Sequence, residues 1–499
     1  MAFNSFNFAV FLLGVLVVYQ VFGKVSRQAG LVTLAAASLL FYASQPWHAI
    51  IVLFGSLSLN YCAALLIEAN QDRPVLQGRI LWLAVAANVG ALAWFKYVSY
   101  YFLKESNTQV MIMPLGISFF TIMQIGALID LRQGGAKLSG PLEYVLFGAW
   151  FPHIMSGPIL RFQDFTRQLS GLGGLRAMDV AAGLTYFSVG LFKKALADRV
   201  GATPNLLYEH AGHAMPELVW AGLLGYALQL YFDFSGYSDM AIGIARMFSI
   251  RYPVNFDAPY QATSIIDFWQ RWHMSLTRFI MGYIYNPISM AFARREIVRT
   301  KSSYKKIITT GRGFFKLVAL PMLITMTLAG VWHGYGLQFL VFGVLHGIFL
   351  TINNAWRILL KPRLKLAPLP PILAGFARAG SAILVLLCVI AGQIFFRASS
   401  IHNAILVLQG AIGIHDSTAM APDPSWRGWA FTFLLLASTW IMPSSQRILD
   451  GTVPVKLPFF GIELPLWRPS LGWAVCACLL LIGGVYAFSA PSGFLYVQF

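Results

Sequence analysis

Apolar stretches of about 20 residues recur along almost the whole chain, separated by short polar segments. That length matches the hydrocarbon thickness of a bilayer, so each stretch predicts a membrane-spanning helix. We expect these helices near residues 6–23, 30–46, 48–67, 80–103, 112–130, 178–197, 217–235, 314–333, 336–356, 371–396, 428–446 and 470–490. The pattern predicts an all-α polytopic membrane protein.

Composition supports this class. Of the 499 residues, 58% are hydrophobic and only 11% are charged, whereas soluble domains are about one-quarter charged. The formal net charge is +17, from 36 Lys and Arg against 19 Asp and Glu. Cytoplasmic loops of polytopic proteins collect Lys and Arg, so this excess does not indicate nucleic acid binding. The four cysteines lie in apolar stretches and indicate no disulfide framework.

Loop charge also indicates orientation. Lys24 and Arg27 follow the first predicted span and Arg73 and Arg79 precede the fourth, which favours an N-terminus outside the cytoplasm. The adjacent Lys193 and Lys194 near a helix end are expected to extend toward the interface.

The most charged segment, Arg294 to Lys316, contains a single acidic residue, Glu296. We expect it in the cytoplasm, where topology alone requires such a loop and lipid headgroups are available contacts. The functional alternative is a docking surface for the phosphates of a donor such as coenzyme A. The candidate phosphate-binding residues are Arg294, Arg295, Lys305 and Lys306.

Two histidines interrupt the apolar stretch 328–347. His333 lies between Trp332 and Gly334, and Gly336 follows, so the backbone can open there and admit a second molecule to the ring. Imidazole accepts protons near neutral pH, which makes His333 a candidate catalytic residue. His346 lies in the middle of the next span and is better explained as a structural histidine bonded to a neighbouring helix.

Segment 264–280 predicts one amphipathic helix, with Ser264 and Asp267 as a capping pair at its start. His273 falls at the margin of the apolar arc and Trp272 within it. That position suits either a ring facing a cavity or a hydrogen-bonded histidine at the interface.

A polar cluster lies in the predicted span 217–235 and just beyond it. Its carboxylates are costly in an apolar setting unless they are paired, and Gly236 is expected to interrupt the helix between them. Ordering a cavity wall is the favoured role, with direct chemistry as the alternative. The candidate site-shaping residues are Gln229, Tyr231, Asp233, Ser235 and Asp239. No ligand spacing such as His-x-x-x-His occurs, so we expect neither a metal nor a bound cofactor.

Several motifs occur in an order that resembles the membrane-bound O-acyltransferase superfamily, in detail over about residues 110–350. They are Met113-Pro-Leu-Gly-Ile-Ser-Phe-Phe120, Phe151-Pro-His-Ile-Met-Ser-Gly-Pro-Ile159 with Arg161, Gly190-Leu-Phe-Lys-Lys194, Tyr231-Phe-Asp-Phe-Ser-Gly-Tyr-Ser-Asp239, Asn255-Phe-Asp-Ala-Pro-Tyr260, Phe268-Trp-Gln-Arg-Trp-His273-Met-Ser-Leu276 and Val331-Trp-His333-Gly334. The closing segment Phe494–Phe499 is also similar to the family. Within the superfamily the chain looks most like the bacterial polysaccharide branch typified by alginate O-acetyltransferase.

The resemblance implies a single integral-membrane domain over 1–499, with N-terminal helices in 1–105 and C-terminal helices in 371–499. It also implies a ring of roughly 11–13 transmembrane helices, with re-entrant and interfacial helices, around a central funnel. It assigns His333 to the catalytic position and His273 to the second active-site position. The segment around His153 departs from the commoner family pattern.

The resemblance further implies a multi-pass enzyme of a bacterial inner membrane. We expect it to move an acetyl group from acetyl-CoA or another acyl thioester toward an exopolysaccharide such as alginate or cellulose. An extracytoplasmic SGNH-like acetyltransferase is the expected relay partner. The alternatives are D-alanyl or lipid O-acyl transfer, or a transporter that uses the histidines as a proton relay.

Overall fold

The structure is a computed structural model that describes residues 1–98, 113–155, 157–364, 368–414, 425–457, 461–487 and 494–495. Its contacts divide the chain into two compact units. The first unit comprises Met1–Ala195, Asp233–Pro253 and Trp467–Gln498, and the second comprises Leu196–Phe232 and Val254–Leu466. Each unit is described separately below.

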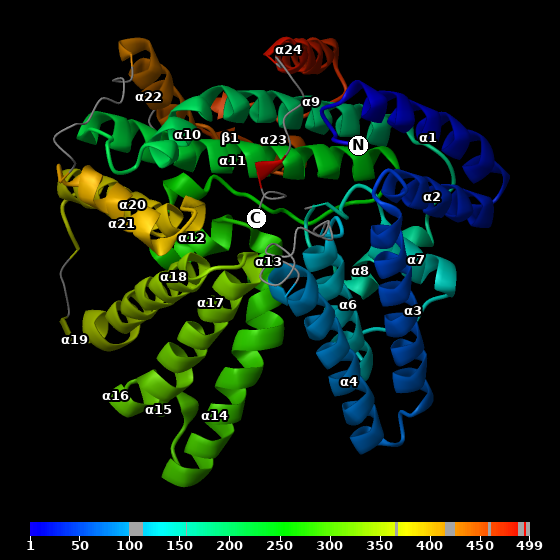
Figure 1. Ribbon diagram of the computed structural model, residues 1–499, viewed down its shortest axis with the longest axis horizontal. Coiled ribbons are helices and arrows are strands. Elements are labelled where there is room, and N and C mark those ends of the chain that lie inside the picture. The colour runs from blue at the N-terminus through cyan, green and yellow to red at the C-terminus, as the bar shows by residue number, and fades with distance from the viewer. Residues whose placement is uncertain are drawn as a thin grey trace. The chain divides into compact units, whose positions relative to one another are not determined.

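Helices make up the first unit (Figure 1). They are α1 (Phe6–Val25), α2 (Arg27–Tyr42), α3 (Trp47–Ala69), α4 (Pro74–Ala93) with its π-helical extension η1 (Trp94–Val98), α6 (Ile117–Arg132), α7 (Pro141–Ala149), α8 (Phe162–Leu169), most of α9 (Ala177–Val200), the second half of α11 (Pro216–Met247) and α24 (Leu471–Ala487). Serine side chains begin α1 and α2, because Ser5 accepts a hydrogen bond from the Phe8 amide and Ser26 accepts one from the Ala29 amide.

The second unit is also helical, apart from one small hairpin. Its helices are α10 (Ala202–Glu209), the first half of α11, η2 (Pro259–Gln261), α12 (Ile265–Arg271), α13 (Met274–Ile280), η3 (Met281–Tyr285), α14 (Asn286–Thr300), α15 (Tyr304–Ile308), α16 (Gly311–Phe314), η4 (Phe315–Ala319), α17 (Leu320–His333), α18 (Leu337–Ala355), η5 (Trp356–Leu360), α19 (Lys361–Leu364), α20 (Pro371–Arg397), α21 (Ile401–Ala411), α22 (Trp426–Ile441) and α23 (Ser445–Leu449). The hairpin pairs β1 (Val455–Lys456) with β2 (Glu463–Leu464) in antiparallel register.

Each predicted span coincides with a helix in the part of the chain that the structure describes. Six helical segments there are long and apolar enough to cross a membrane: Phe6–Val25, Trp47–Ala69, Pro74–Val98, Gly311–His333, Leu337–Leu364 and Pro371–Arg397. Of the helices at the remaining predicted spans, α2 and α6 are shorter, with 16 residues each, whereas α9 and α11 have 24 and 32 residues. Residues 99–103, 112 and 488–490 of the predicted spans, and 496–499 of the closing motif, lie outside the described residues.

One prediction about α11 is wrong. Gly236 does not interrupt the helix, which continues through it to Met247. The glycine instead allows α9 and α11 to touch, because a Cβ at Gly236 would lie 2.7 Å from the carbonyl oxygen of Gly190. Small residues are typical of positions where two membrane helices approach this closely.

This crossing pairs the buried charges of the first unit. The ammonium group of Lys194 lies 2.7 Å from a carboxylate oxygen of Asp233, and that of Lys193 lies 2.7 Å from Asp239. Asp233 also accepts a hydrogen bond from the Leu495 amide. The expectation that both lysines extend toward the interface is therefore wrong, because each carboxylate supplies a closer partner and both members of the Lys194–Asp233 pair are buried.

Candidate active site

The candidate catalytic histidine lies where a buried helix ends. His333 is the last residue of α17, and the backbone becomes extended at Gly334. Gly336 has a φ of +112°, a conformation that favours glycine, before α18 begins at Leu337. The helix therefore ends at His333 beside the two glycines, and access of a second molecule to the ring stays a prediction.

Close packing of α17 against α18 determines the position of His333. A Cβ at Gly330 would lie 2.4 Å from the carbonyl oxygen of Phe339, and one at Gly343 would lie 2.4 Å from that of Met326. The two backbones therefore touch along the hairpin, as the adjacent ribbons in Figure 1 show. Any larger side chain at these positions would separate the helices.

Aromatic rings surround the imidazole of His333, which is buried. Trp332 and Phe396 contact it edge to face, with centroid distances of 4.9 and 5.2 Å. Phe342 of α18 adds a third ring at 5.9 Å. These contacts restrict the orientation of the imidazole and limit its exposure to water.

His346 has the structural role expected from the sequence. Its Nδ1 accepts a hydrogen bond of 3.3 Å from the indole Nε1 of Trp269, which belongs to α12. On the opposite side α20 approaches so closely that a Cβ at Gly392 would lie 2.3 Å from the His346 Nε2. The ring is therefore held between two other helices, with little room for a substrate.

The prediction of one continuous helix over 264–280 is wrong. Ser264 does cap α12, accepting a hydrogen bond from the Asp267 amide, but that helix ends at Arg271. Trp272 is extended and His273 has a left-handed backbone with φ +41° and ψ 52°, after which α13 begins. For a residue other than glycine this conformation costs about 1–2 kcal/mol, so neighbouring contacts must hold it.

Asn255 supplies those contacts. Its side-chain oxygen lies 3.1 Å from His273 Nδ1 and accepts hydrogen bonds from both the amide and the hydroxyl of Ser275. Its carbonyl oxygen accepts a further bond from the Met274 amide. Asn255 thus connects a preceding loop to His273 and to the first turn of α13.

The same bonds determine the protonation state of His273. Because the Asn255 oxygen accepts from a backbone amide, it is an acceptor toward Nδ1 as well, so Nδ1 carries the hydrogen. Burial lowers the pKa of His273 to about 3, and the imidazole is neutral at physiological pH. In that state its Nε2 is a hydrogen-bond acceptor.

A continuous series of aromatic contacts connects the two candidate histidines within the second unit. Neighbouring rings in the series have centroids 4.8–6.4 Å apart. From His333 it passes through Phe342, His346, Trp269, Phe268, Trp272 and Phe256 to His273. The two candidate histidines therefore lie at the ends of one packed series with six intervening rings.

The remaining site-shaping candidates separate into two groups. Tyr231 lies against Trp272, the residue before His273, with ring centroids 6.4 Å apart. Gln229 is buried in the second unit, with its side chain over Gly201. The other candidates belong to the first unit: Asp233 and Asp239 in the lysine pairs described above, and the buried Ser235.

The basic segment forms a small pocket of about 130 Å³. Of the four phosphate-binding candidates, Lys306 lines it, together with Arg299 and Arg312, while Arg294, Arg295 and Lys305 are not among its lining residues. Hydrogen bonds from Lys316 and Arg299 lower the pKa of Glu296 to about 2, so this acid remains charged and occupied by those two cations.

Sequence reasoning missed three contributors. Asn255 appeared only within a family motif, although an amide between apolar neighbours is a signal for a buried hydrogen-bonding role. Phe396 and Gly392 come from α20, far along the chain, and no local pattern links them to the histidines. Among the residues that the structure describes, no cluster of three or more His, Cys, Asp or Glu side chains is placed to hold a metal ion.

Comparisons with known proteins point to one family. The model of the MBOAT, membrane-bound O-acyltransferase family, matches residues 128–304. A peptidoglycan O-acetyltransferase of Helicobacter pylori is 33% identical over 93% of this chain and 91% of its own length. A probable alginate O-acetylase of Pseudomonas aeruginosa is 32% identical over 74% of this chain and 67% of its own. A teichoic acid D-alanyltransferase of Streptococcus thermophilus is 29% identical over 50% and 59%.

The chain belongs to the membrane-bound O-acyltransferase family. It is therefore a multi-pass, all-α membrane protein and an O-acyltransferase. The family resemblance recognised in the motif order is confirmed.

Replacing Asn255 by Ala should lower kcat for acyl transfer about 10- to 100-fold with little change in KM, because His273 loses the acceptor that orients it. Steady-state thioester consumption by the purified protein measures both constants. Ser275→Ala, which removes one donor to the same oxygen and leaves the His273 contact, should have a clearly smaller effect. Equal effects of the two variants would contradict an orienting role for Asn255.

Proposed function

We propose that this enzyme transfers an acetyl group from a cytoplasmic thioester, acetyl-CoA, for O-acetylation of a cell-envelope polysaccharide. The observation that carries the proposal is the position of His333, a buried imidazole at the C-terminal end of α17. The names of two relatives, a peptidoglycan O-acetyltransferase and a probable alginate O-acetylase, support acetyl as the group and a polysaccharide as the final acceptor.

His333 is proposed as the general base. Its imidazole removes the proton from the acceptor hydroxyl while that oxygen attacks the thioester carbonyl carbon. The tetrahedral intermediate collapses, the carbon–sulfur bond breaks, and the leaving thiolate takes the proton from the imidazolium. The aromatic rings around His333 keep the reacting atoms out of water.

A different role is proposed for His273. Stabilising the acyl oxygen as charge develops on it would require an N–H directed at that oxygen. With Nδ1–H bonded to Asn255 and the ring neutral, Nε2 accepts a hydrogen bond instead. We therefore assign His273 to orienting a hydroxyl donor, such as the acceptor or a neighbouring side chain.

A relay is proposed between this chain and the polymer. The strand-forming and irregular segments described outside the helices are short, as the two-residue strands β1 and β2 show, and too small to form a saccharide-binding domain. An extracytoplasmic SGNH-like acetyltransferase would take the acetyl group and pass it on, with this chain in the bacterial inner membrane.

Two other functions are less well supported. D-alanyl transfer has a relative of 29% identity over half of this chain, and lipid O-acylation has no relative among those compared above. A transporter with a histidine proton relay does not explain the similarity to acetyltransferases.

Purified protein in proteoliposomes tests the proposal with radiolabelled acetyl-CoA. The wild type should consume the thioester, slowly when alone, and acetylate polysaccharide only after the partner is added. His333→Ala should reduce consumption about 10²–10⁴-fold, because general-base catalysis is lost. His346→Ala should mainly lower the melting temperature, since that ring connects α12, α18 and α20. Wild-type turnover by a folded His333→Ala protein would refute the assignment, and binding without turnover by the wild type would support the transporter.

The basic pocket is proposed as the first docking point of the donor. A volume of about 130 Å³ is below the usual range of about 300–1,000 Å³ for pockets that enclose a whole ligand, so it suits one phosphate group. Lys306 and Arg312 supply charge there that Glu296 does not neutralise. From Gly313, at the pocket, to His333 the helical rise is about 30 Å. The donor would therefore dock at this pocket before its acyl group reacts at His333.

Neutralising this pocket should weaken donor capture. Lys306→Gln with Arg312→Gln should raise KM for acetyl-CoA about tenfold and reduce its salt dependence, with kcat nearly unchanged. The matched control is Arg294→Gln with Arg295→Gln, which removes the same charge outside the pocket and should have a smaller effect. If both double variants change KM equally, diffuse charge and not a phosphate site attracts the donor. If neither variant changes KM, the basic segment only determines the membrane topology of the chain.

A further inference from the structure

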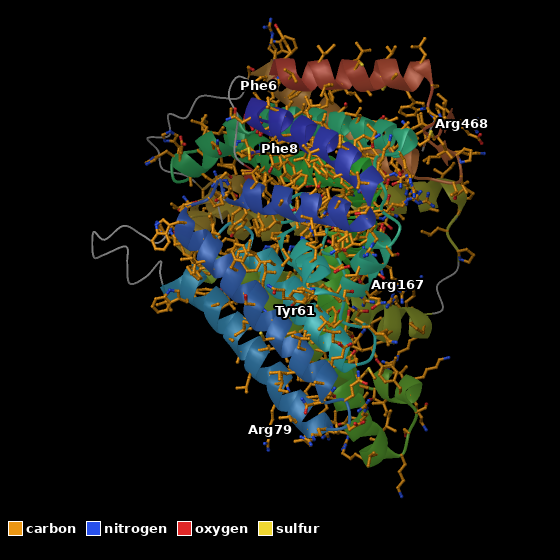
Figure 2. All side chains as sticks on the ribbon, turned by 90° about the vertical axis from the view of Figure 1, so that its right-hand side faces the viewer. Phe6, Phe8, Tyr61, Arg79, Arg167 and Arg468 are labelled. Atoms are coloured by element: carbon orange, nitrogen blue, oxygen red, sulfur yellow. The ribbon has the colours of Figure 1, made fainter. Side chains whose placement is uncertain are left out.

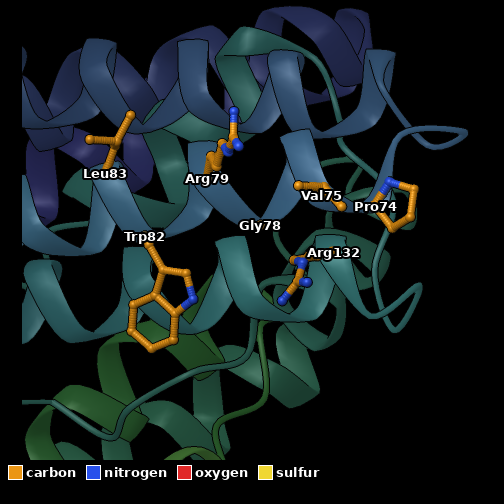
Figure 3. A pocket seen from close by; sticks show the side chains of 7 residues that line it. All are labelled: Pro74, Val75, Gly78, Arg79, Trp82, Leu83 and Arg132. Carbon is orange, nitrogen blue, oxygen red and sulfur yellow. The ribbon is translucent and has the colours of Figure 1, made fainter.

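An open groove of about 840 Å³ lies beside α4 and α6 in the first unit, and none of the candidate site residues lines it. Figure 3 shows the residues that line it: Pro74, Val75, Gly78, Arg79, Trp82, Leu83 and Arg132. Five of the side chains and Gly78 come from α4, and Arg132 is the last residue of α6. The groove has a cationic and an apolar part.

Two guanidinium groups form the cationic part. Arg79 and Arg132 are both exposed, and neither makes an ion pair in the described part of the chain. No acidic residue lines the groove. The two positive charges are therefore uncompensated in the groove that both residues line, which favours an anion with several acceptor oxygens.

Gly78 allows Arg132 to approach α4 closely. In Figure 3 it lies between the side chains of Arg79 and Arg132. A Cβ at Gly78 would lie 3.3 Å from a terminal nitrogen of Arg132, closer than an ordinary contact. Without a side chain at this position, the guanidinium of a neighbouring helix can lie against α4.

The apolar part belongs to a membrane-spanning helix. Val75, Trp82 and Leu83 are 70%, 68% and 72% exposed, and α4 begins the candidate span Pro74–Val98. Large apolar side chains that are exposed on such a helix contact lipid tails. A tryptophan near the end of a span is typical of the interface between tails and headgroups.

The depth of the charges fits this interface. Arg79 lies about 8 Å along the helix axis from Pro74, the first residue of the span, and Figure 2 shows it near the lower end of α4. Loop charge favours the cytoplasmic side for this end of the helix. Anionic phospholipids are concentrated in that leaflet.

We propose that this groove is a binding site for one anionic glycerophospholipid. Arg79 and Arg132 bind the headgroup phosphate through charge-assisted hydrogen bonds, and an acyl chain lies along Trp82 and Leu83. A zwitterionic headgroup carries its own cation, which the two arginines would repel, so the site prefers phosphatidylglycerol over phosphatidylcholine.

Lipid retention by the full-length protein tests the site. The protein is reconstituted in nanodiscs of phosphatidylcholine and phosphatidylglycerol, released into mild detergent, and examined by native mass spectrometry. One phosphatidylglycerol should be retained at least about tenfold more often than phosphatidylcholine. Arg79→Gln and Arg132→Gln should each reduce that preference severalfold. Gly78→Leu, which fills the groove without changing its charge, should reduce it as well.

Arg73→Gln is the matched control, because Arg73 is an exposed cation beside the same helix that does not line the groove. It should leave the preference unchanged, and melting temperatures in phosphatidylcholine alone verify that every variant is folded. Glycerophosphate, the headgroup without tails, should not displace the lipid. Equal retention of the two lipids, an equal loss in Arg73→Gln, or displacement by glycerophosphate would each overturn the proposal. If Gly78→Leu does not fold, the lipid preference of the three arginine variants still tests the proposal.

Discussion

The contact between the backbones of α17 and α18 is the constraint on which the candidate active site depends. Gly330 and Gly343 leave no space between the two helices, so the end of α17 has one position relative to Phe342 and His346 of α18. Gly392 then brings α20 against His346, and Phe396 from the same helix reaches His333. These three glycines therefore determine where His333 lies, because each allows neighbouring helices to approach closely.

Hydrogen bonding inside the protein is the second requirement, because lipid supplies no water to buried polar groups. Asn255 meets it around His273, where three donors converge on one oxygen and offset the cost of a left-handed backbone. Net values of about 1 kcal/mol for each hydrogen bond are sufficient for that purpose. The first unit meets the same requirement with ion pairs: losing Lys194 would leave the Asp233 carboxylate buried without that cation, at a cost of about 3–5 kcal/mol.

Hydrophobic patterning located the helices well, because a span must be about 20 apolar residues long whatever its neighbours are. It also separated His333, at a helix end beside glycines, from His346 in the middle of a span. Hydrophobic patterning did not predict the helix break at His273. The helical period of apolar residues continues across that position, and the break depends on tertiary hydrogen bonds to Asn255. The pattern also gave the wrong prediction at Gly236. Glycine permits either a helix break or a close contact between helices, and the contact with Gly190 cannot be recognised from the local sequence.

The most direct test of the account is the structure of the protein in a nanodisc with a non-hydrolysable acetyl-thioether analogue of the donor. The account predicts that the acyl carbonyl lies close to the imidazole of His333, within direct hydrogen-bonding distance or one water molecule of the reacting atoms. It also predicts that Asn255 keeps its contact with His273. An acyl group bound elsewhere, with His333 still enclosed by Trp332, Phe342 and Phe396, would contradict the central claim.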